Sequence, residues 1–289
     1  MANAEREWLA REFELQRPRL RAIAYRMLGS QSEAEDAVQE AWLRLSGTAG
    51  GEVEQLGAWL TTVVARISLN QLRSRKTRGE APMPEPIIDR ADGTSPEHAA
   101  LLADSLGLAL LLVLETLAPA ERVAFVLHDI FDLPFEEIAP IVQRTPEAAR
   151  QLASRGRRRV QTRSTPDPDL GVQRNVVDAF LVAAQGGDVR GLIAVLDPAV
   201  VLRSDAGAAG ARVEAHGAAE VARRASSFSQ LGVLRRPALV NGSAGAVCML
   251  EGKPFSVMAF TVKGGKIVEI DIVRDAARLR QLDLSALDG

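Results

Sequence analysis

Six arginines and a single acid, Glu147, lie between Thr145 and Arg163 in the stretch TPEAARQLASRGRRRVQTR. Guanidinium groups at this density suit phosphate oxygens, and Arg or Gln side chains near the start of a helix can form paired hydrogen bonds with base edges in the major groove. The chemistry that this stretch offers is therefore recognition of a nucleic acid. For one such run by itself, a solvated helix face is the alternative.

A second basic cluster runs from Arg66 to Arg78 without an acid. The whole chain carries 35 lysines and arginines against 37 aspartates and glutamates, a formal net charge of −2, so its cations are gathered rather than in excess. A polyanion would therefore meet two local footprints, although a solvated helix face again remains the alternative. The residues of this cluster that we expect at nucleic acid are Arg66, Asn70, Arg73, Arg75, Lys76 and Arg78.

The elements that must position the first stretch form a helix-turn-helix pattern. The helix LPFEEIAPIV is followed by the turn QRT and then by the basic stretch, with Thr145 as N-cap and Pro146 at the first helical position. Gln143 stands where the turn usually has glycine, so a positive φ there would cost about 1 to 2 kcal/mol. Base readers should precede phosphate holders along this surface, which comprises Arg144, Thr145, Glu147, Ala148, Arg150, Gln151, Ser154, Arg155, Arg157 and Arg158.

Two proline-containing breaks divide the 289 residues. They predict a helical domain over residues 1–80, a Pro-rich linker over 81–98, a second helical domain over 99–165 and a third domain over 166–289. In the first domain we expect Gly29 to end one helix, Ser32 and Glu35 to form a capping box for the next, and a third helix to run from about Ala58 to Arg75. An apolar helix over residues 99–117 should open the second.

The third domain has a different pattern. Two helices precede a strand, AVVLRSD, and another helix is expected over residues 217–231. The segments RRPALV, GAVCML, KPFSVMAFTV and KIVEIDIVR are separated by short turn sequences, which predicts an antiparallel meander. The fold class is therefore multidomain, with two all-α domains followed by an α+β domain whose sheet curls over helices.

Several classes of protein are excluded by composition. A single cysteine, Cys248, forms no disulfide framework and fits a reducing cytoplasm. The charged N-terminus is no signal peptide, and the longest apolar run, LGLALLLVL, is far shorter than a membrane span. No metal-ligand spacing occurs in the sequence, so we expect no metal and no cofactor. The interpretation is a soluble cytoplasmic protein without a membrane partner.

Two groups of segments carry a family resemblance. DAVQEAWLRL and AWLTTVVARISLNQLRSR resemble regions 2.1 to 2.4 of bacterial RNA polymerase sigma factors of the extracytoplasmic-function (ECF) class, and the segment PAERVAFVLHDIFDLPFEEIAPIVQRTPEAARQLASRGRRRV resembles their region 4. The rest of the chain resembles the SnoaL-like, NTF2-type cone fold. This order is similar to the SigJ-like group of sigma factors.

The resemblance implies a promoter-specificity subunit that binds the RNA polymerase core and promoter DNA. Region 4 would meet the β flap, and the loop from Ser46 to Leu56 would hold a flipped base of the minus-ten element beside Asn70 and Arg73. The basic stretch after Thr145 would read the minus-35 element. Contacts to the β′ clamp helices would come from Asp36, Gln39, Glu40 and Arg44.

The group's further signatures are partly present. Its proline-rich linker motif corresponds to PMPEP, in which Pro84, Glu85 and Pro86 are expected to be regulatory. Its glycine-rich loop corresponds to DAGAAGAR from Asp205 to Arg212, and its terminal motif to DAARL from Asp275 to Leu279.

Cone folds of this type resemble cyclases and isomerases that use a buried Asp or His. The candidate pocket residues here are Asp205, His216 and Asp271, together with Cys248. We expect no catalysis and a structural or regulatory role, with a small molecule as a candidate partner of this domain. The alternatives are a SnoaL-like small-molecule enzyme or ligand sensor fused to a DNA-binding regulator, and a polymerase-independent repressor.

Overall fold

The computed structural model describes residues 2–47, 55–79, 84–93, 107–161, 166–205, 213–227, 229 and 232–287. The chain divides into two compact units. The first comprises Met1–Pro84 and Leu111–Thr162, and the second comprises Glu85–Leu110 and Arg163–Gly289. Within the described ranges, every helix is too short or too polar to cross a membrane.

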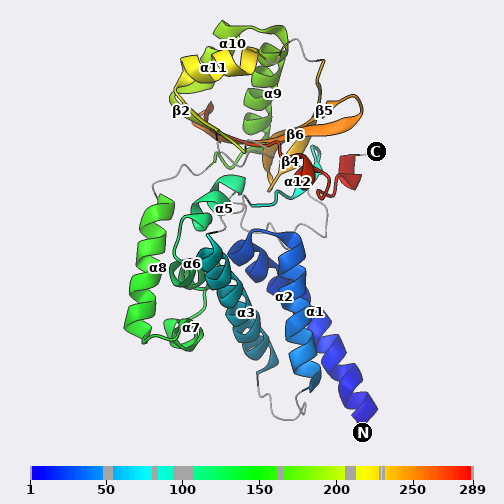
Figure 1. Ribbon diagram of the computed structural model, residues 1–289, viewed down its shortest axis with the longest axis vertical. Coiled ribbons are helices and arrows are strands. Elements are labelled where there is room, and N and C mark those ends of the chain that lie inside the picture. The colour runs from blue at the N-terminus through cyan, green and yellow to red at the C-terminus, as the bar shows by residue number, and fades with distance from the viewer. Residues whose placement is uncertain are drawn as a thin grey trace. The chain divides into compact units, whose positions relative to one another are not determined.

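Three long helices open the first unit: α1 (Ala2–Leu28), α2 (Gln31–Gly47) and α3 (Leu56–Arg78) (Figure 1). Gly29 ends α1 with a φ of 72°, as predicted. The predicted capping box is wrong, because Ser30 rather than Ser32 precedes α2 and accepts a hydrogen bond from the Glu33 amide at 3.4 Å. Glu35 instead pairs with two arginines of α1, Arg17 and Arg21.

The helix-turn-helix follows in the same unit. After α5 (Gly107–Glu115), α6 (Pro119–Phe125) and a π-helical turn η2 (Val126–Ile130) come α7 (Phe135–Val142) and α8 (Pro146–Gln161). Gln143 adopts the left-handed conformation, with φ 58° and ψ 52°. The Thr145 hydroxyl accepts a hydrogen bond from the Ala148 amide at 3.3 Å. The turn and its N-cap are thus confirmed, whereas residues 99–106 of the predicted apolar helix lie outside the described residues.

Two contacts fix this second group of helices. Gly156 lets α8 approach α6 closely, because a Cβ at this position would lie 2.9 Å from the Phe125 Cβ. Arg122 of α6 is fully buried, pairs with Glu115 at 2.7 Å and donates to the Arg26 carbonyl of α1 at 3.4 Å. A buried charge is costly unless an opposite charge and hydrogen bonds accompany it. The first unit is therefore held together by an internal polar contact as well as by apolar packing.

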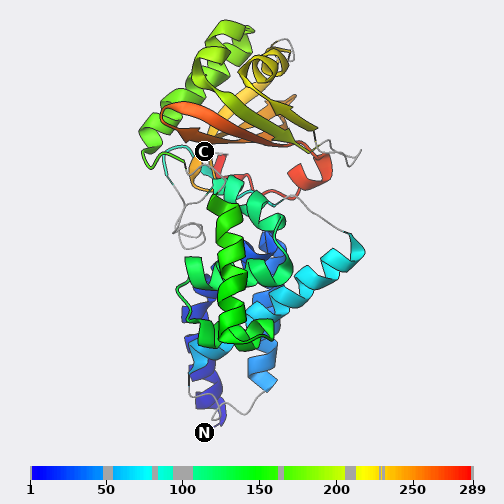
Figure 2. The same cartoon turned by 90° about the vertical axis from the view of Figure 1, so that its left-hand side faces the viewer.

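The second unit contains a seven-stranded mixed sheet in the order β1-β4-β5-β6-β7-β2-β3. Its helices α9 (Leu170–Gly186), α10 (Val189–Val195) and α11 (Ala218–Ser226) lie on one face of the sheet in both views (Figure 1 and Figure 2). The strands are β1 (Ile88–Arg90), β2 (Leu196–Ser204), β3 (Val213–His216), β4 (Leu234–Val240), β5 (Ser243–Leu250), β6 (Lys253–Lys263) and β7 (Lys266–Val273). Short helical turns follow at α12 (Ala276–Leu279) and η5 (Ser285–Leu287).

The core of this unit lies between the sheet and the three helices. Phe180 of α9 meets Phe260 of β6 edge to face, with ring centroids 5.3 Å apart. Strands β4 to β7 form the predicted antiparallel meander, and β2 joins β7 in parallel. The predicted class, helical regions followed by an α+β domain, is confirmed.

Two strands were not predicted. β3 pairs with β2, and β1 pairs with β4 at the edge of the sheet. β1 comes from the segment predicted to be a linker, where Ile87 and Ile88 are buried. A proline-rich stretch is compatible with an edge strand because an edge leaves one side of the ladder unpaired. The first of the three points at which the chain passes between the two units falls between Pro84 and Glu85.

Candidate nucleic-acid interface and C-terminal cavity

The outer face of α8 carries the predicted base readers. Glu147, Arg150, Gln151 and Arg158 are exposed and recur at three, four and seven residues, which places them on one side of the helix. The Arg150 guanidinium lies over the Phe135 ring, 5.2 Å from its centroid. A hydrogen bond from its own backbone, followed by one with Thr145, lowers the pKa of Glu147. Of the other predicted members, Arg144 and Thr145 are exposed, and Ala148 and Ser154 are half-buried.

Two further exposed arginines of α8 pair with acids of their own unit. Arg155 pairs with Glu121 at 2.7 Å, and Arg157 pairs with Asp129 at 2.5 Å. The hydrogen bond with Asp129 raises the pKa of Arg157. Both residues were predicted to lie at DNA, and their side chains remain 48% and 44% exposed beside these ion pairs. No sequence pattern indicated the carboxylates that lie opposite them.

The residues of α3 that were predicted at the minus-ten element differ in their exposure. Asn70, Lys76 and Arg78 are exposed, and Arg73 is half-buried. Arg66 is exposed and donates to the Pro140 carbonyl of α7 at 3.3 Å. The described part of this face therefore presents cations and an amide along its length.

Arg75 departs from the prediction. Its exposure is 7%, its guanidinium pairs with Glu33, and it donates to the Leu28 carbonyl at 2.8 Å. Leu28 is the last residue of α1 and Glu33 lies in the first turn of α2. Arg75 thus fastens α3 to the α1–α2 corner, and its burial removes it from the surface that nucleic acid can reach.

An exposed face of α2 contains the residues expected to bind polymerase. Asp36, Gln39 and Arg44 are exposed, and Glu40 is half-exposed and pairs with Arg44 at 2.5 Å. Leu43 lies among them with 61% of its surface exposed. Sequence reasoning missed Leu43, although its spacing of seven from Asp36 put it on the same side of the helix. A leucine surrounded by polar residues is suited to the centre of a protein interface.

Three expected regions fall wholly or partly outside the described residues. They are the minus-ten loop, of which 48–54 are not described, Pro82 of the PMPEP motif, and 206–212 of the glycine-rich loop. Of the expected regulatory linker, Pro84 and Pro86 are buried and Glu85 is half-buried.

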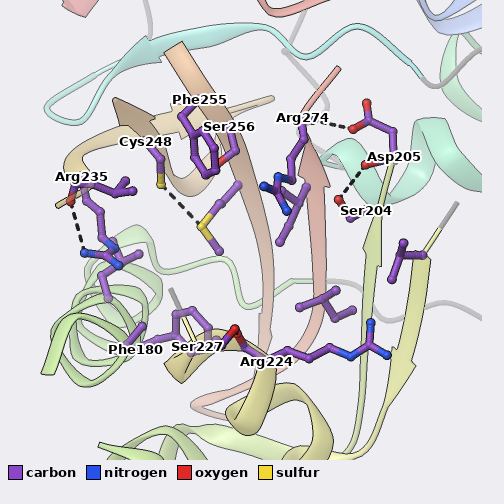
Figure 3. A pocket seen from close by; sticks show the side chains of 18 of the residues that line it. Phe180, Ser204, Asp205, Arg224, Ser227, Arg235, Cys248, Phe255, Ser256 and Arg274 are labelled. Carbon is purple, nitrogen blue, oxygen red and sulfur yellow. Dashed lines mark hydrogen bonds between the residues drawn. The ribbon is translucent and has the colours of Figure 1, made fainter. Parts of the chain in front are cut away.

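A cavity of about 680 Å³ lies within the second unit. Of the candidate pocket residues, Asp205 and Cys248 line it, whereas His216 and Asp271 do not (Figure 3). The Asp205 carboxylate is already engaged, since one oxygen accepts hydrogen bonds from the backbone amides of Arg274 and Asp275 at 2.5 and 3.1 Å.

Asp271 and His216 were predicted to line the pocket, but strand alternation directs their side chains away from the cavity. Asp271 alternates with Ile272, which lines the cavity, so its carboxylate lies on the other face of β7 and bonds with Arg203 at 3.1 Å. His216 has 69% of its side chain exposed, at the end of β3. The predicted group of three pocket residues is thus not brought together.

Comparisons with known proteins bear on the helical regions and on the whole chain. The Sigma-70 region 2 family model matches residues 13–78, and the Sigma-70 region 4 model matches residues 107–160. The ECF RNA polymerase sigma factor SigJ of Mycobacterium tuberculosis is 38% identical over 89% of this chain and 88% of its own length. A probable ECF RNA polymerase sigma factor of the same organism, SigI, is 34% identical over 90% of this chain and 91% of its own.

A solved structure extends the similarity to three dimensions. The crystal structure of M. tuberculosis SigJ matches 95% of this chain and 99% of its own with a TM-score of 0.75 and 33% sequence identity. The similarity therefore includes the α+β domain as well as the two helical regions. The chain belongs to the extracytoplasmic-function family of RNA polymerase sigma factors.

Proposed function

We propose that the exposed face of α2 is the polymerase-binding surface of this sigma factor. The β′ clamp helices would be contacted, around Leu43, by Asp36, Gln39, Glu40 and Arg44. Region 4 would meet the β flap. Both contacts would form in the cytoplasm. The exposure of Leu43 among polar side chains supports this assignment. Leu43→Asp should therefore weaken capture of core polymerase, whereas Arg11→Ala on α1 should not.

We propose further that α3 and α8 divide the promoter between them. Asn70, Arg73 and Lys76 would flank the minus-ten element, and α8 would enter the major groove at the minus-35 element. Support comes from the outward face of α8, where Arg150 and Gln151 can reach base edges and Arg158 can reach a phosphate. This face is the observation that carries the assignment.

The test is transcription reconstituted from core polymerase, this chain and supercoiled promoter libraries. We expect transcripts that start at one class of promoter and that disappear when the chain is omitted. Arg150→Ala should shift the selected minus-35 sequence. Transcripts that require the chain but show the same minus-35 preference in the wild type and in Arg150→Ala would refute the role of α8.

The α+β domain is proposed to modulate this activity. Catalysis is not favoured, because one Asp205 oxygen accepts hydrogen bonds from two backbone amides and the other lies 3.8 Å from the Arg278 guanidinium. Asp271 is bonded to Arg203 outside the cavity. The small-molecule enzyme thus lacks a supporting observation, whereas a cavity with a charged lining supports a binding role.

A shortened chain that lacks the α+β domain would still contain β1, because β1 precedes α5. In that chain β1 would have lost its partner strand, β4. A chain that ends at residue 163 should therefore also carry Ile87→Ser and Ile88→Ser, which replace side chains that the sheet covers. The control is the full chain with the same two substitutions. We expect transcription by the shortened chain to differ from that of the control. Equal transcription would leave the domain without a regulatory role.

A further inference from the structure

The cavity of the second unit has an apolar body. Its lining includes Phe180, Leu202, Val233, Met258 and Ile272, contributed by a helix, by strands and by a loop. Its volume of about 680 Å³ is within the range of roughly 300 to 1,000 Å³ that small-molecule sites occupy. The cavity is therefore large enough for an apolar ligand of moderate size.

A polar row crosses the sheet at this cavity. Arg235 of β4 is paired in register with Cys248 of β5, and Cys248 is paired with Ser256 of β6. Arg274 directly follows Val273 of β7, which is paired with Val257, the neighbour of Ser256. The row thus has an arginine at each end, and Figure 3 shows Arg235 and Arg274 on opposite sides of Cys248 and Ser256. All four residues line the cavity.

The charges around the cavity do not balance. Four arginines line it, at positions 223, 224, 235 and 274, whereas Asp205 is the single acid among the described lining residues. Arg223 and Arg224 share the carboxylate of Glu220, at 2.8 and 2.6 Å. Arg235 donates to the Val233 carbonyl at 3.3 Å, which is a neutral acceptor. The single acid, Asp205, accepts a hydrogen bond from the Arg274 backbone amide at 2.5 Å. The described lining therefore carries more guanidinium groups than carboxylates.

Two further observations indicate that the guanidinium groups of Arg235 and Arg274 exert their fields on the same part of the cavity, near Cys248. The Arg274 guanidinium lies over the Phe255 ring, 4.8 Å from its centroid, which holds it in position at the cavity wall. Burial raises the pKa of the Cys248 thiol, while a hydrogen bond with Ser256 and the positive charges of Arg235 and Arg274 oppose that rise. Both guanidinium groups thus exert their fields on one point between them.

We propose that this cavity binds an amphipathic carboxylate, with its head group held between Arg235 and Arg274 and its apolar body against Phe180 and Met258. A guanidinium presents two parallel N–H groups to a carboxylate, and a hydrogen bond of this charge-assisted kind is about twice as strong as a neutral one. The hydroxyl of Ser256 can donate a third hydrogen bond to the same head group. The proposal concerns binding only, and it is independent of the regulatory role proposed for the domain.

Calorimetry with the full-length protein tests the proposal with probes that differ only in the head group. The probes are decanoate and decyltrimethylammonium below their micelle concentrations, decan-1-ol below its solubility limit, and acetate as a head group without a body. We expect decanoate to bind at least about tenfold more tightly than decan-1-ol, because a charged hydrogen bond contributes that much or more. Decyltrimethylammonium and acetate should give no measurable binding.

Variants then locate the site. Arg235→Gln and Arg274→Gln should each weaken decanoate binding at least about tenfold and leave decan-1-ol binding unchanged. The matched control is Arg236→Gln. Arg236 is the next residue along β4, is absent from the cavity lining, and donates to the Leu287 carbonyl at 3.0 Å. Its replacement should change decanoate binding by less than about twofold, because its side chain lies on the other face of the strand.

Three outcomes would overturn the proposal: equal affinity for decanoate and decan-1-ol, no binding of decanoate, or the same loss in Arg236→Gln as in Arg235→Gln. Thermal unfolding of each variant, followed by circular dichroism, shows whether the sheet is intact. Transcription assays with decanoate are a separate measurement. If decanoate binds without altering transcription, the binding site stands, and the regulatory role of the domain is decided by the shortened chain.

Discussion

Helices α3 and α8 both carry concentrated positive charge toward their C-terminal ends, yet they use it differently. In α3 one arginine, Arg75, is buried against the α1–α2 corner, and the other cations of the cluster remain at or near the surface. In α8 the arginines at positions 150, 155, 157 and 158 are all exposed. Arg155 and Arg157 pair with acids on α6 and η2, whereas the proposed DNA contacts come from Arg150 and Arg158.

The difference shows that the number of positive charges does not measure a nucleic-acid surface. An arginine opposite a carboxylate of its own domain contributes to the packing of that domain, and its field outside is largely compensated. An arginine of the same helix that does not lie opposite such a carboxylate keeps its field for a partner. Four experiments test this division, and they are ordered by expected effect.

The largest effect is expected for Arg75→Ala. The substitution leaves the Leu28 carbonyl and Glu33 without their partner, so the free energy of unfolding should fall by about 3 kcal/mol, the low end for a buried pair because Glu33 is partly exposed. Urea unfolding followed by tryptophan fluorescence isolates the first unit, because Trp8, Trp42 and Trp59 all lie there. The control, Lys76→Ala, should change stability by less than about 0.5 kcal/mol. Equal losses would remove the distinction within α3.

Gly156→Ala tests how closely α8 packs against α6. The new methyl group would meet the Phe125 Cβ at 2.9 Å, so α8 must shift, at a cost of about 1 to 3 kcal/mol by the same tryptophan measurement. The ion pairs that Arg155 and Arg157 form should weaken when α8 shifts. A variant as stable as the wild type, with unchanged promoter binding, would show that the close approach of α8 to α6 is not required.

Promoter binding should separate the outer residues of α8. Arg150→Ala or Gln151→Ala should cost about 1 to 3 kcal/mol in binding of the polymerase holoenzyme to its preferred promoter and should relax minus-35 preference. Arg158→Ala should weaken binding to all sequences alike and lower the salt slope by about 1. Filter binding at several salt concentrations gives both quantities. Loss of preference in Arg158→Ala would reverse the assigned roles.

The smallest effect is expected for the ion pair between Arg157 and Asp129. The Arg157 side chain is 44% exposed, so a double-mutant cycle of Arg157→Ala and Asp129→Ala should give a coupling of about 0.2 to 1 kcal/mol. Promoter binding by Arg157→Ala should keep the wild-type salt slope. A slope lower by about 1 would place Arg157 at a phosphate, as on the outer face.

Much of the fold followed from local patterns. Gly29, the Thr145 N-cap and the turn at Gln143 were predicted because backbone conformation at helix ends depends on nearby residues. The meander from β4 to β7 was predicted for the same reason, since its turns are short. The strands β1 and β3 were missed because their partners are distant or separated by a long loop, and a strand of three or four residues gives too little alternation to detect.

The candidate sites were predictable to a smaller extent. The outward positions of Arg150 and Gln151 follow from helical spacing once Ala149 and Ala153 are known to be buried. The cavity row of Arg235, Cys248, Ser256 and Arg274 had no sequence signal, because its members are brought together by strand register across the sheet.

The sequence by itself determined the order of the domains, the helix-turn-helix and the two basic clusters, since each depends on residues within a few turns of one another. Only the tertiary structure decided which arginines remain for a partner. Whether Arg75 and Arg157 are engaged depends on Glu33 and Asp129, which lie on other elements. The same physical reason applies to Asp205, whose carboxylate meets backbone amides that lie distant in the chain.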